Sequence, residues 1–452
     1  MMINNFISPI NQAEQRYREH TEVRRERRRN LQSLGQGGDW RKVDDPERIA
    51  QRIKRLGLPT SGAGLPEPVL LERILGSNDL ITTDFLIRGA AAARSVGRIV
   101  IRSSQDSVLG YGTGFLVSPS LLMTNNHVLK SQQAAANSLV QFNYRETLGG
   151  ALSTPYTFHL QPERFFRTYE HLDFTLVAVA ARSAEGLELR SLGWNRLIAE
   201  TGKILVGERV NIIQHPGGKP QQLALRMNQI SDLLDDFLHY SADTERGSSG
   251  SPVFNDQWEL VSLHHAGVPR RDQDERILLV SGDPWDGSDE TFEQIDWKAN
   301  EGARISRIVT YLNAQQPDFS AEERFLYQQA FSSPAEELLE AVPALDVLPP
   351  VPEETAAPVL ASEPPVVQAR PSGAGGPLRS IPFEIWVAEN GEVGLYFPAG
   401  QINPQPAAKQ QIEAVKPASV EQKPAGLSAR TNGFHNRPPY PLPQKKPLPQ
   451  LV

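Results

Sequence analysis

Short runs of Val, Ile, Leu and Phe, separated by clusters of Gly, Pro, Asn and Ser, follow one another from about Val96 to Leu263. Runs of this length and composition are typical of β-strands, and their close spacing is typical of a sandwich or a barrel. Long helical periodicity is scarce in the same stretch. The sequence therefore predicts an all-β domain, which we place at residues 96–313.

Helical segments are expected on both sides of this domain. Residues 1–69 hold a dense mixture of Arg and Glu and predict a charged helical or flexible arm, either solvated or binding a partner through its basic cluster. Residues 70–95 place apolar residues at helical spacing and predict a helical lead-in. Residues 302–313 return to helical spacing and predict a helix that closes the domain. Its apolar residues share one face: Ile305, Ile308, Val309 and Leu312.

The remaining residues, 314–452, differ in composition from the rest of the chain. Of the 36 prolines, 23 fall in residues 317–452, which predicts a largely disordered tail. Within it, residues 320–341 have a helical pattern, and residues 381–397 form two β-type runs around an Asn-Gly turn, typical of a hairpin. The last residues suit polyproline II, either as a ligand of an SH3-type partner or as a plain solvated tail.

Composition excludes several classes of function. The chain has no Cys, so disulfide frameworks, thiolate metal sites and Cys nucleophiles are ruled out. Its net charge of −7 argues against a nucleic-acid partner. No apolar run approaches the roughly 18 residues of a spanning helix, and no ordinary secretory signal is visible. We therefore expect no membrane partner and a cytoplasmic location, with secretion by an unconventional route left open.

The strongest chemical signal is the run from Gly247 to Pro252, which reads GSSGSP and precedes a strand-like Val-Phe. A serine hydroxyl is a poor nucleophile unless a base removes its proton and amide groups stabilise the oxyanion. Flanking glycines allow the tight turn that directs such amides inward. The run predicts Ser249 as nucleophile, with the amides of Gly247 and Ser249 as an oxyanion hole.

A serine nucleophile needs a histidine and an orienting carboxylate. Among the nine histidines, His127 stands near the end of a strand run, in LLMTNNHVL, where its ring can lie at a barrel rim. Asp173 is the only aspartate between residues 128 and 231 and directly precedes an alternating apolar strand. Alone, each residue is more typical of a loop or a turn. The order His127, Asp173, Ser249 indicates a catalytic triad.

These motifs resemble the chymotrypsin-like double β-barrel serine proteases and, within them, the bacterial V8-like glutamyl endopeptidases. The resemblance covers about residues 96–313. The segments that carry it are GTGFLVSPSLLMTNNHVL, LDFTLVAV, GERVNIIQHPGGKPQQLALRMNQI and GSSGSPVFNDQWELVSLHHAGVP. It implies a double β-barrel with a helical N-terminal extension, a closing helix and the Pro-rich tail, and peptide-bond hydrolysis through an acyl-enzyme.

The resemblance also implies a substrate preference. In glutamyl endopeptidases a histidine on the strand after the nucleophile and a Thr or Ser five residues before it bind a substrate carboxylate, and the matching positions here are His264 and Thr244. Because successive strand residues face opposite ways, only one of His264 and His265 should enter the pocket. His265 and Ala266 stand where the family has Trp and Gly, so a cleft of different shape is expected.

The sequence thus predicts a Ser/His/Asp endopeptidase that prefers Glu or Asp before the cut and needs no cofactor. No metal site is expected, because neighbouring strand histidines diverge and a third ligand is not evident. The alternative is a protease-fold scaffold or adaptor that acts through its basic N-terminal arm and its Pro-rich tail. Whether the N-terminal segment inhibits the barrel or merely precedes it stays open.

Overall fold

The computed structural model describes residues 3–34, 38–58, 81–225, 228–241, 247–288, 290–334, 384–387 and 393–396. The chain divides into two compact units, residues 1–356 and 357–452. In the second unit, strands β15 (Glu384–Val387) and β16 (Val393–Tyr396) pair antiparallel within the range where a hairpin is predicted. The predicted disorder of the tail concerns residues that lie mostly outside the described ones.

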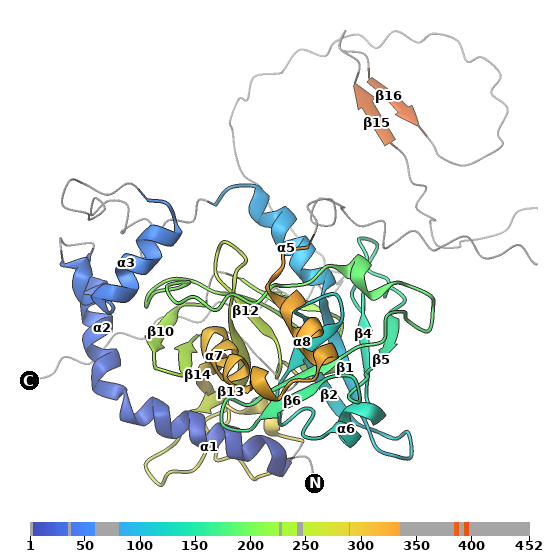
Figure 1. Cartoon of the computed structure of the whole chain (residues 1–452). Coiled ribbons are helices and arrows are strands. Elements are labelled where there is room, and N and C mark those ends of the chain that lie inside the picture. The colour runs from blue at the N-terminus through green and yellow to red at the C-terminus, as the bar shows by residue number, and fades with distance from the viewer. Residues whose placement is uncertain are drawn as a thin grey trace, which may run out of the picture. The chain divides into compact units, whose positions relative to one another are not determined.

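Two antiparallel sheets of seven strands each form the centre of the first unit (Figure 1). The first sheet has the order β5-β4-β1-β2-β3-β7-β6 and the second the order β10-β11-β14-β13-β12-β8-β9. Strands of the first sheet are β1 (Val96–Arg102), β2 (Val108–Leu116), β3 (Leu121–Thr124), β4 (Leu139–Phe142), β5 (Tyr156–His159), β6 (Phe166–Tyr169) and β7 (Phe174–Ala178). Strands of the second are β8 (Asn211–Gln214), β9 (Gln222–Ala224), β10 (Ile230–Leu233), β11 (Phe237–Tyr240), β12 (Pro252–Phe254), β13 (Leu260–Pro269) and β14 (Trp297–Arg304).

This architecture is consistent with the two-barrel fold of chymotrypsin-like proteins. One apolar cluster joins the two sheets, because it combines Phe115 and Leu176 of the first sheet with Phe254 and Leu263 of the second. All four side chains are fully buried. The junction of the two sheets is therefore rigidly packed, and residues held there keep fixed relative positions.

The helices are α1 (Ile3–Glu19), α2 (Thr21–Ser33), α3 (Pro46–Arg55), α5 (Asp84–Arg94), α6 (Gln132–Asn137), α7 (Ile305–Gln315) and α8 (Ala321–Gln328). The predicted closing helix is α7, and its four expected apolar residues are buried. It begins at Ile305 and not at residue 302, because residues 302–304 continue β14. In the predicted helix 320–341, α8 ends at Gln328, and residues beyond 334 lie outside the described ones. None of the helices in the described part of the chain is long and apolar enough to span a membrane.

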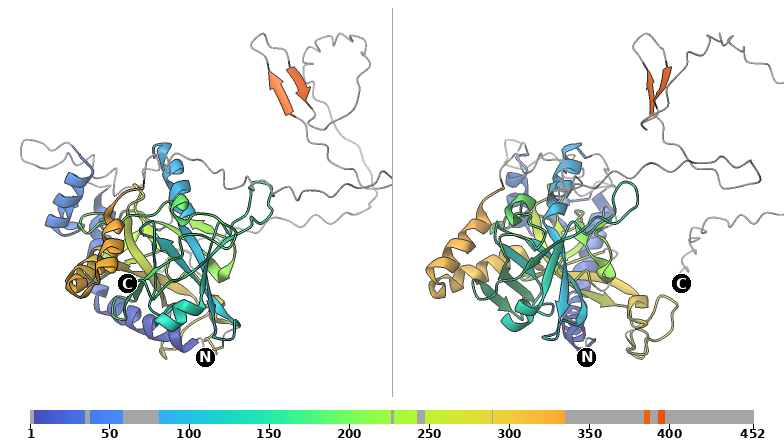
Figure 2. Two further views of the ribbon diagram at one scale, coloured as in Figure 1. Left: turned by 45° about the vertical axis from the view of Figure 1, so that its right-hand side comes forward. Right: turned by 90° about the vertical axis from the view of Figure 1, so that its right-hand side faces the viewer.

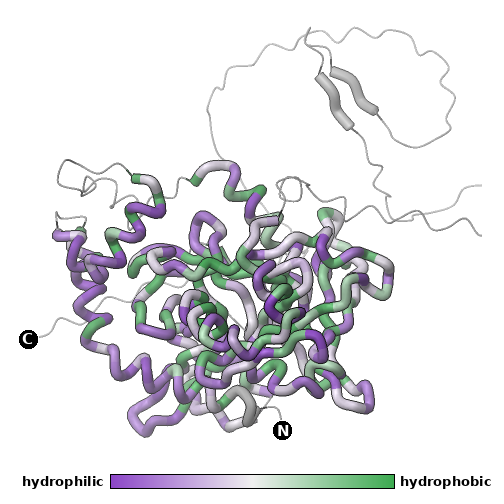
Figure 3. Tube along the Cα trace, viewed as in Figure 1, coloured by the Kyte–Doolittle hydropathy of each residue, from purple (hydrophilic) through white to green (hydrophobic). Residues whose placement is uncertain are grey.

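The N-terminal helices lie against the second sheet (Figures 1 and 2), where α1 contacts β13 and α2 contacts β10. Both helices are mostly hydrophilic (Figure 3). Even so, Arg24 of α2 is only 7% exposed and Arg52 of α3 only 1% exposed. The interpretation of residues 1–69 as a solvated arm therefore does not hold for these helices, since their Arg side chains pair with buried carboxylates such as Asp232 and Glu208.

Candidate active site

His127 and Asp173 meet at one end of two neighbouring strands. Strand β3 ends at Thr124 and β7 begins at Phe174, and the two strands pair antiparallel, with Thr124 opposite Thr175. The residues that follow β3 and precede β7 therefore share one edge of the first sheet. His127 Nδ1 lies 2.6 Å from Asp173 Oδ2, and the backbone amide of His127 donates to Asp173 Oδ1 at 3.0 Å. One carboxylate thus holds both the ring and the backbone of the histidine.

Asp173 is buried, and its side chain is only 6% exposed. Burial by itself raises the pKa of Asp173, but the charge of His127 and hydrogen bonds from His127 and His265 outweigh it and hold that pKa well below its ordinary value. Asp173 is therefore ionised at neutral pH. An ionised, buried carboxylate at Nδ1 keeps the proton on that nitrogen and leaves Nε2 as the basic atom of His127.

Ser249 lies on a glycine-bounded turn between the two sheets. Gly247 and Gly250 adopt φ values of 93° and 89°, which side chains rarely tolerate. The turn is tied to the first sheet by the amide of Thr113, which donates to the carbonyl of Ser249 at 2.9 Å, and by the Thr113 hydroxyl, which donates to the carbonyl of Gly247 at 2.7 Å. It is tied to the second sheet by the amide of Gly250, which donates to the carbonyl of His264 at 3.0 Å.

Gly112 brings the surroundings of Ser249 and His127 together. A Cβ atom at Gly112 would lie 2.8 Å from a methyl group of Val128, the neighbour of His127, and 3.6 Å from the carbonyl oxygen of Ser249. The chain segments of the histidine and of the serine therefore pack on the same glycine of β2. This close approach requires a residue without a side chain.

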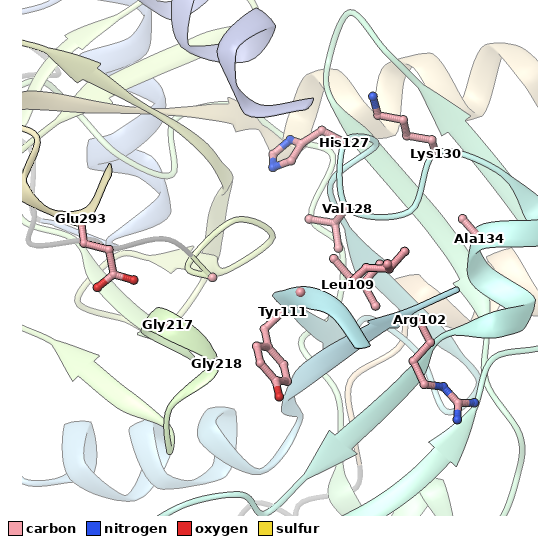
Figure 4. A pocket seen from close by; sticks show the side chains of 13 residues that line it. Arg102, Leu109, Tyr111, His127, Val128, Lys130, Ala134, Gly217, Gly218 and Glu293 are labelled. Carbon is pink, nitrogen blue, oxygen red and sulfur yellow. The ribbon is translucent and has the colours of Figure 1, made fainter. Parts of the chain in front are cut away.

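His127 and Gly247 also line a common pocket of about 360 Å³ (Figure 4). Its walls combine apolar side chains with a few charged groups. The lining residues are Ile101, Arg102, Leu109, Gly110, Tyr111, His127, Val128, Lys130, Ala134, Gly217, Gly218, Gly247 and Glu293. The pocket is large enough to receive side chains of a peptide next to His127.

Of the two residues predicted to bind a substrate carboxylate, His264 and Thr244, the structure describes only His264. Thr244 lies outside the described residues. His264 is buried on β13, and its Nδ1 lies 2.7 Å from the hydroxyl of Tyr240. Burial, together with the charges of His265 and His127, lowers the pKa of His264 to about 3. His264 is therefore neutral at pH 7, and its proton is on Nε2 in the tautomer in which the Tyr240 hydroxyl donates to Nδ1.

His265 takes a position that the alternation of strand residues did not predict. The register between β13 and β14 shifts between His264 and Ala266, so His265 occupies a β-bulge. Both histidines are buried, as are the neighbouring residues of this strand, and His265 Nδ1 lies 3.2 Å from Asp173 Oδ2. A bulge redirects a side chain in this way, and only the pairing of β13 with β14 reveals it.

A further contact that the sequence did not reveal holds Asp173 in place. The amide of the Asn125 side chain donates to the backbone carbonyl of Asp173 at 2.8 Å. Both residues lie in motifs that were recognised from the sequence, but neither motif predicts that the Asn125 side chain binds the backbone of Asp173.

Parts of this chain are similar to known proteins. Residues 112–263 match the family model described as a trypsin-like peptidase domain. Uncharacterized protein y4fB of Sinorhizobium fredii is 36% identical over 286 residues, which are 59% of this chain and 42% of that protein, so the chain spans less than half of this relative's length. The crystal structure of the active form of the Rv3671c protease from M. tuberculosis matches with a TM-score of 0.33 and 16% identity over 57% of this chain and 88% of that one. The residues matched by the family model of the trypsin-like peptidase domain include His127, Asp173 and the Ser249 turn.

Proposed function

We propose that the protein is a serine endopeptidase that uses Ser249, His127 and Asp173. The observation that carries this proposal is that the Asp173 carboxylate binds both the Nδ1 atom and the backbone amide of His127. These two contacts orient the imidazole for proton transfer at Nε2. They lie within the residues that match the trypsin-like peptidase domain.

In the proposed reaction, His127 Nε2 takes the proton of the Ser249 hydroxyl while Oγ attacks the carbonyl carbon of the substrate. The carbonyl oxygen becomes an oxyanion that accepts hydrogen bonds from the amides of Gly247 and Ser249. His127 then gives the proton to the leaving nitrogen, and the peptide bond breaks. Water attacks the resulting acyl-enzyme with the same base, which releases the product acid and restores the serine.

We also propose that the residue before the cut is acidic. A buried substrate carboxylate needs hydrogen-bond donors. The low pKa of His264, about 3, keeps its ring neutral at neutral pH, and the ring supplies an Nε2–H when Tyr240 donates to its Nδ1. Thr244 would supply a second donor by resemblance to the glutamyl endopeptidases. In this proposal, His264 recognises the carboxylate as a hydrogen-bond donor and not as a cation.

The test is to incubate the full-length protein with a mixed peptide library and to identify the cut sites by mass spectrometry. We expect cuts after Glu and Asp, and a loss of turnover of about 10⁴-fold or more in Ser249→Ala. Ser332→Ala, which removes a remote exposed hydroxyl, is the matched control and should cleave like the wild type.

Cuts after other residues would reject the acidic pocket and keep the catalytic residues. A fluorophosphonate probe, which reacts with activated serines, provides a second measurement on the same protein. The peptidase proposal would be contradicted if the protein cleaved no peptide and the probe did not label Ser249.

A further inference from the structure

A continuous line of side chains, all buried except the last, leads from Asp173 to the N-terminal helix. Its members are Asp173, His265, Glu301 and Arg16 of α1. His265 Nδ1 lies 3.2 Å from Asp173 Oδ2, and its Nε2 lies 2.8 Å from Glu301 Oε1. Arg16 Nε donates to both oxygens of Glu301, at 3.0 and 3.1 Å. His239 Nε2 lies 2.8 Å from Glu301 Oε2 and completes the surroundings of that carboxylate.

The contacts of His265 favour its positively charged form. Carboxylates face both of its nitrogens, and a neutral imidazole has only one N–H to donate. Burial lowers the pKa of His265, but hydrogen bonds and charges from Asp173 and Glu301 prevail and raise it above the ordinary value. Two carboxylates thus share one buried imidazolium.

Helix α1 contacts the end of the line that lies away from Asp173, through Arg16. Phe237 stacks on the His265 ring at 5.3 Å between ring centres, and the Arg16 guanidinium lies 3.8 Å from the centre of the Phe237 ring. Glu301 is fully buried, while Arg16 remains 19% exposed. Hydrogen bonds from His239, His265 and Arg16 overcome the effect of burial and hold the pKa of Glu301 well below its ordinary value. The second carboxylate is therefore ionised because His239, His265 and, from the N-terminal helix, Arg16 all bind it.

We propose that His265 is a positioning residue for Asp173, and that helix α1, through Arg16 and Glu301, sets the charge that Asp173 presents to His127. This inference rests on the proposed function, because it assigns His127 as the base. His265 and His127 bind the same oxygen, Asp173 Oδ2, so the imidazolium of His265 partly neutralises the carboxylate that supports His127. The groups that face His265 are Asp173, Glu301, His264 and Phe237. His127 and Arg16 lie at the two ends of the line.

Removing the charge of His265 should make His127 easier to protonate. In His265→Gln the amide can still donate a hydrogen bond, but Asp173 faces His127 with its full negative charge. We expect the acid limb of the kcat/KM profile to move to higher pH by at least about half a unit, and kcat to fall because Asp173 is held less firmly. A purely structural defect would lower kcat without moving the limb.

Arg16 provides the matched set of variants on the full-length protein. Arg16→Gln removes a cation from Glu301 and should shift the limb in the same direction by a smaller amount, whereas Arg16→Lys should restore it towards the wild type. Arg18→Gln is the control, because Arg18 lies on the same helix but pairs with Glu14 and Glu275. This control should leave the limb unchanged.

The titration of His127 should also be followed by NMR of histidine-labelled protein in a Ser249→Ala background, which needs no catalytic activity. An upward shift of its midpoint in His265→Gln and in Arg16→Gln, absent in Arg18→Gln, would support the proposal. An unchanged midpoint in Arg16→Gln, or equal shifts in Arg16→Gln and Arg18→Gln, would overturn it, even if His265→Gln fails to fold. A protein that shows the NMR shifts but cleaves no peptide would refute the proposed function and not the coupling.

Discussion

At the scale of single residues, Asp173 combines an uncommon backbone conformation with a buried charge. Its φ of 45° lies in the left-handed region, which Asp tolerates better than most residues. The Asn125 side chain and the carbonyl of Glu170 bind its two backbone polar groups, so the conformation is held from both sides. Strain that neighbours maintain in this way is typical of functional sites.

The charge of Asp173 predicts how stability depends on pH. Its pKa is lowered in the folded protein, so the folded state binds fewer protons than the unfolded state below the ordinary carboxyl value of about 4. The stability that Asp173 contributes is therefore fully present above about pH 4 and is lost as the pH falls towards the folded pKa. In Asp173→Asn, the free energy of unfolding should fall less steeply on acidification below pH ~4. Urea denaturation of both proteins from pH 6 to pH 3 measures this, and equal slopes would contradict it.

At the scale of elements, the Ser249 turn depends on a close approach to the first sheet. A Cβ atom at Gly250 would lie 2.0 Å from the carbonyl oxygen of Thr113 and 2.4 Å from the hydroxyl of Thr124. Thr113 belongs to β2 and Thr124 to β3, and His127 follows β3 by three residues. The turn therefore keeps its place relative to His127 only if position 250 has no side chain.

Gly250→Ala should destabilise the protein by about 2 to 4 kcal/mol, from left-handed strain and from overpacking. It should also reduce peptidase activity, because the serine turn must move away from β2. Gly186→Ala is the matched control: its φ of 90° brings the same backbone strain, but a Cβ there meets nothing within 4 Å. Denaturation and activity assays of both variants separate the two effects. An equal cost in the two variants would show that the contact with β2 is unimportant.

At the scale of the whole molecule, the N-terminal helices are part of the folded unit and pair with carboxylates of the β domain. Arg52 Nε donates to Glu208 at 2.9 Å, and the side chains of both residues are nearly fully buried. Arg55 pairs with Glu259 at 2.7 Å, and these two side chains are about one fifth exposed. These contacts join residues that are far apart in sequence, so folding of the second sheet and docking of the helices should be coupled.

Arg52→Ala should therefore lower the free energy of unfolding by about 3 to 5 kcal/mol, because it leaves the Glu208 carboxylate buried without its cation. Arg41→Ala, at an exposed ion pair with Asp39, should cost less than about 1 kcal/mol. Equilibrium denaturation of the full-length variants gives both values. A loss in Arg52→Ala as small as that in Arg41→Ala would show that α3 is only loosely attached.

The expectations that succeeded rest on local patterns. The short apolar runs indicated a β domain, and the structure has two seven-stranded sheets there. The helical spacing of Ile305, Ile308 and Leu312 indicated α7, since a buried helix face repeats every three to four residues. The exact start of α7 was missed, because residues 302–304 pair with β11 and β13, and pairing with distant strands is not encoded in the local period.

The candidate residues His127, Asp173 and Ser249 follow from the sequence because each stands in a local motif that its chemistry requires. The roles of His265, Glu301 and Arg16 do not, because their contacts span up to 285 residues and depend on a bulge in β13. The same holds for the Arg side chains of residues 1–58, whose charge pattern is typical of solvated helices. Tertiary packing alone selects which of these charges are buried and paired, since a charge leaves water only where a partner is already in place.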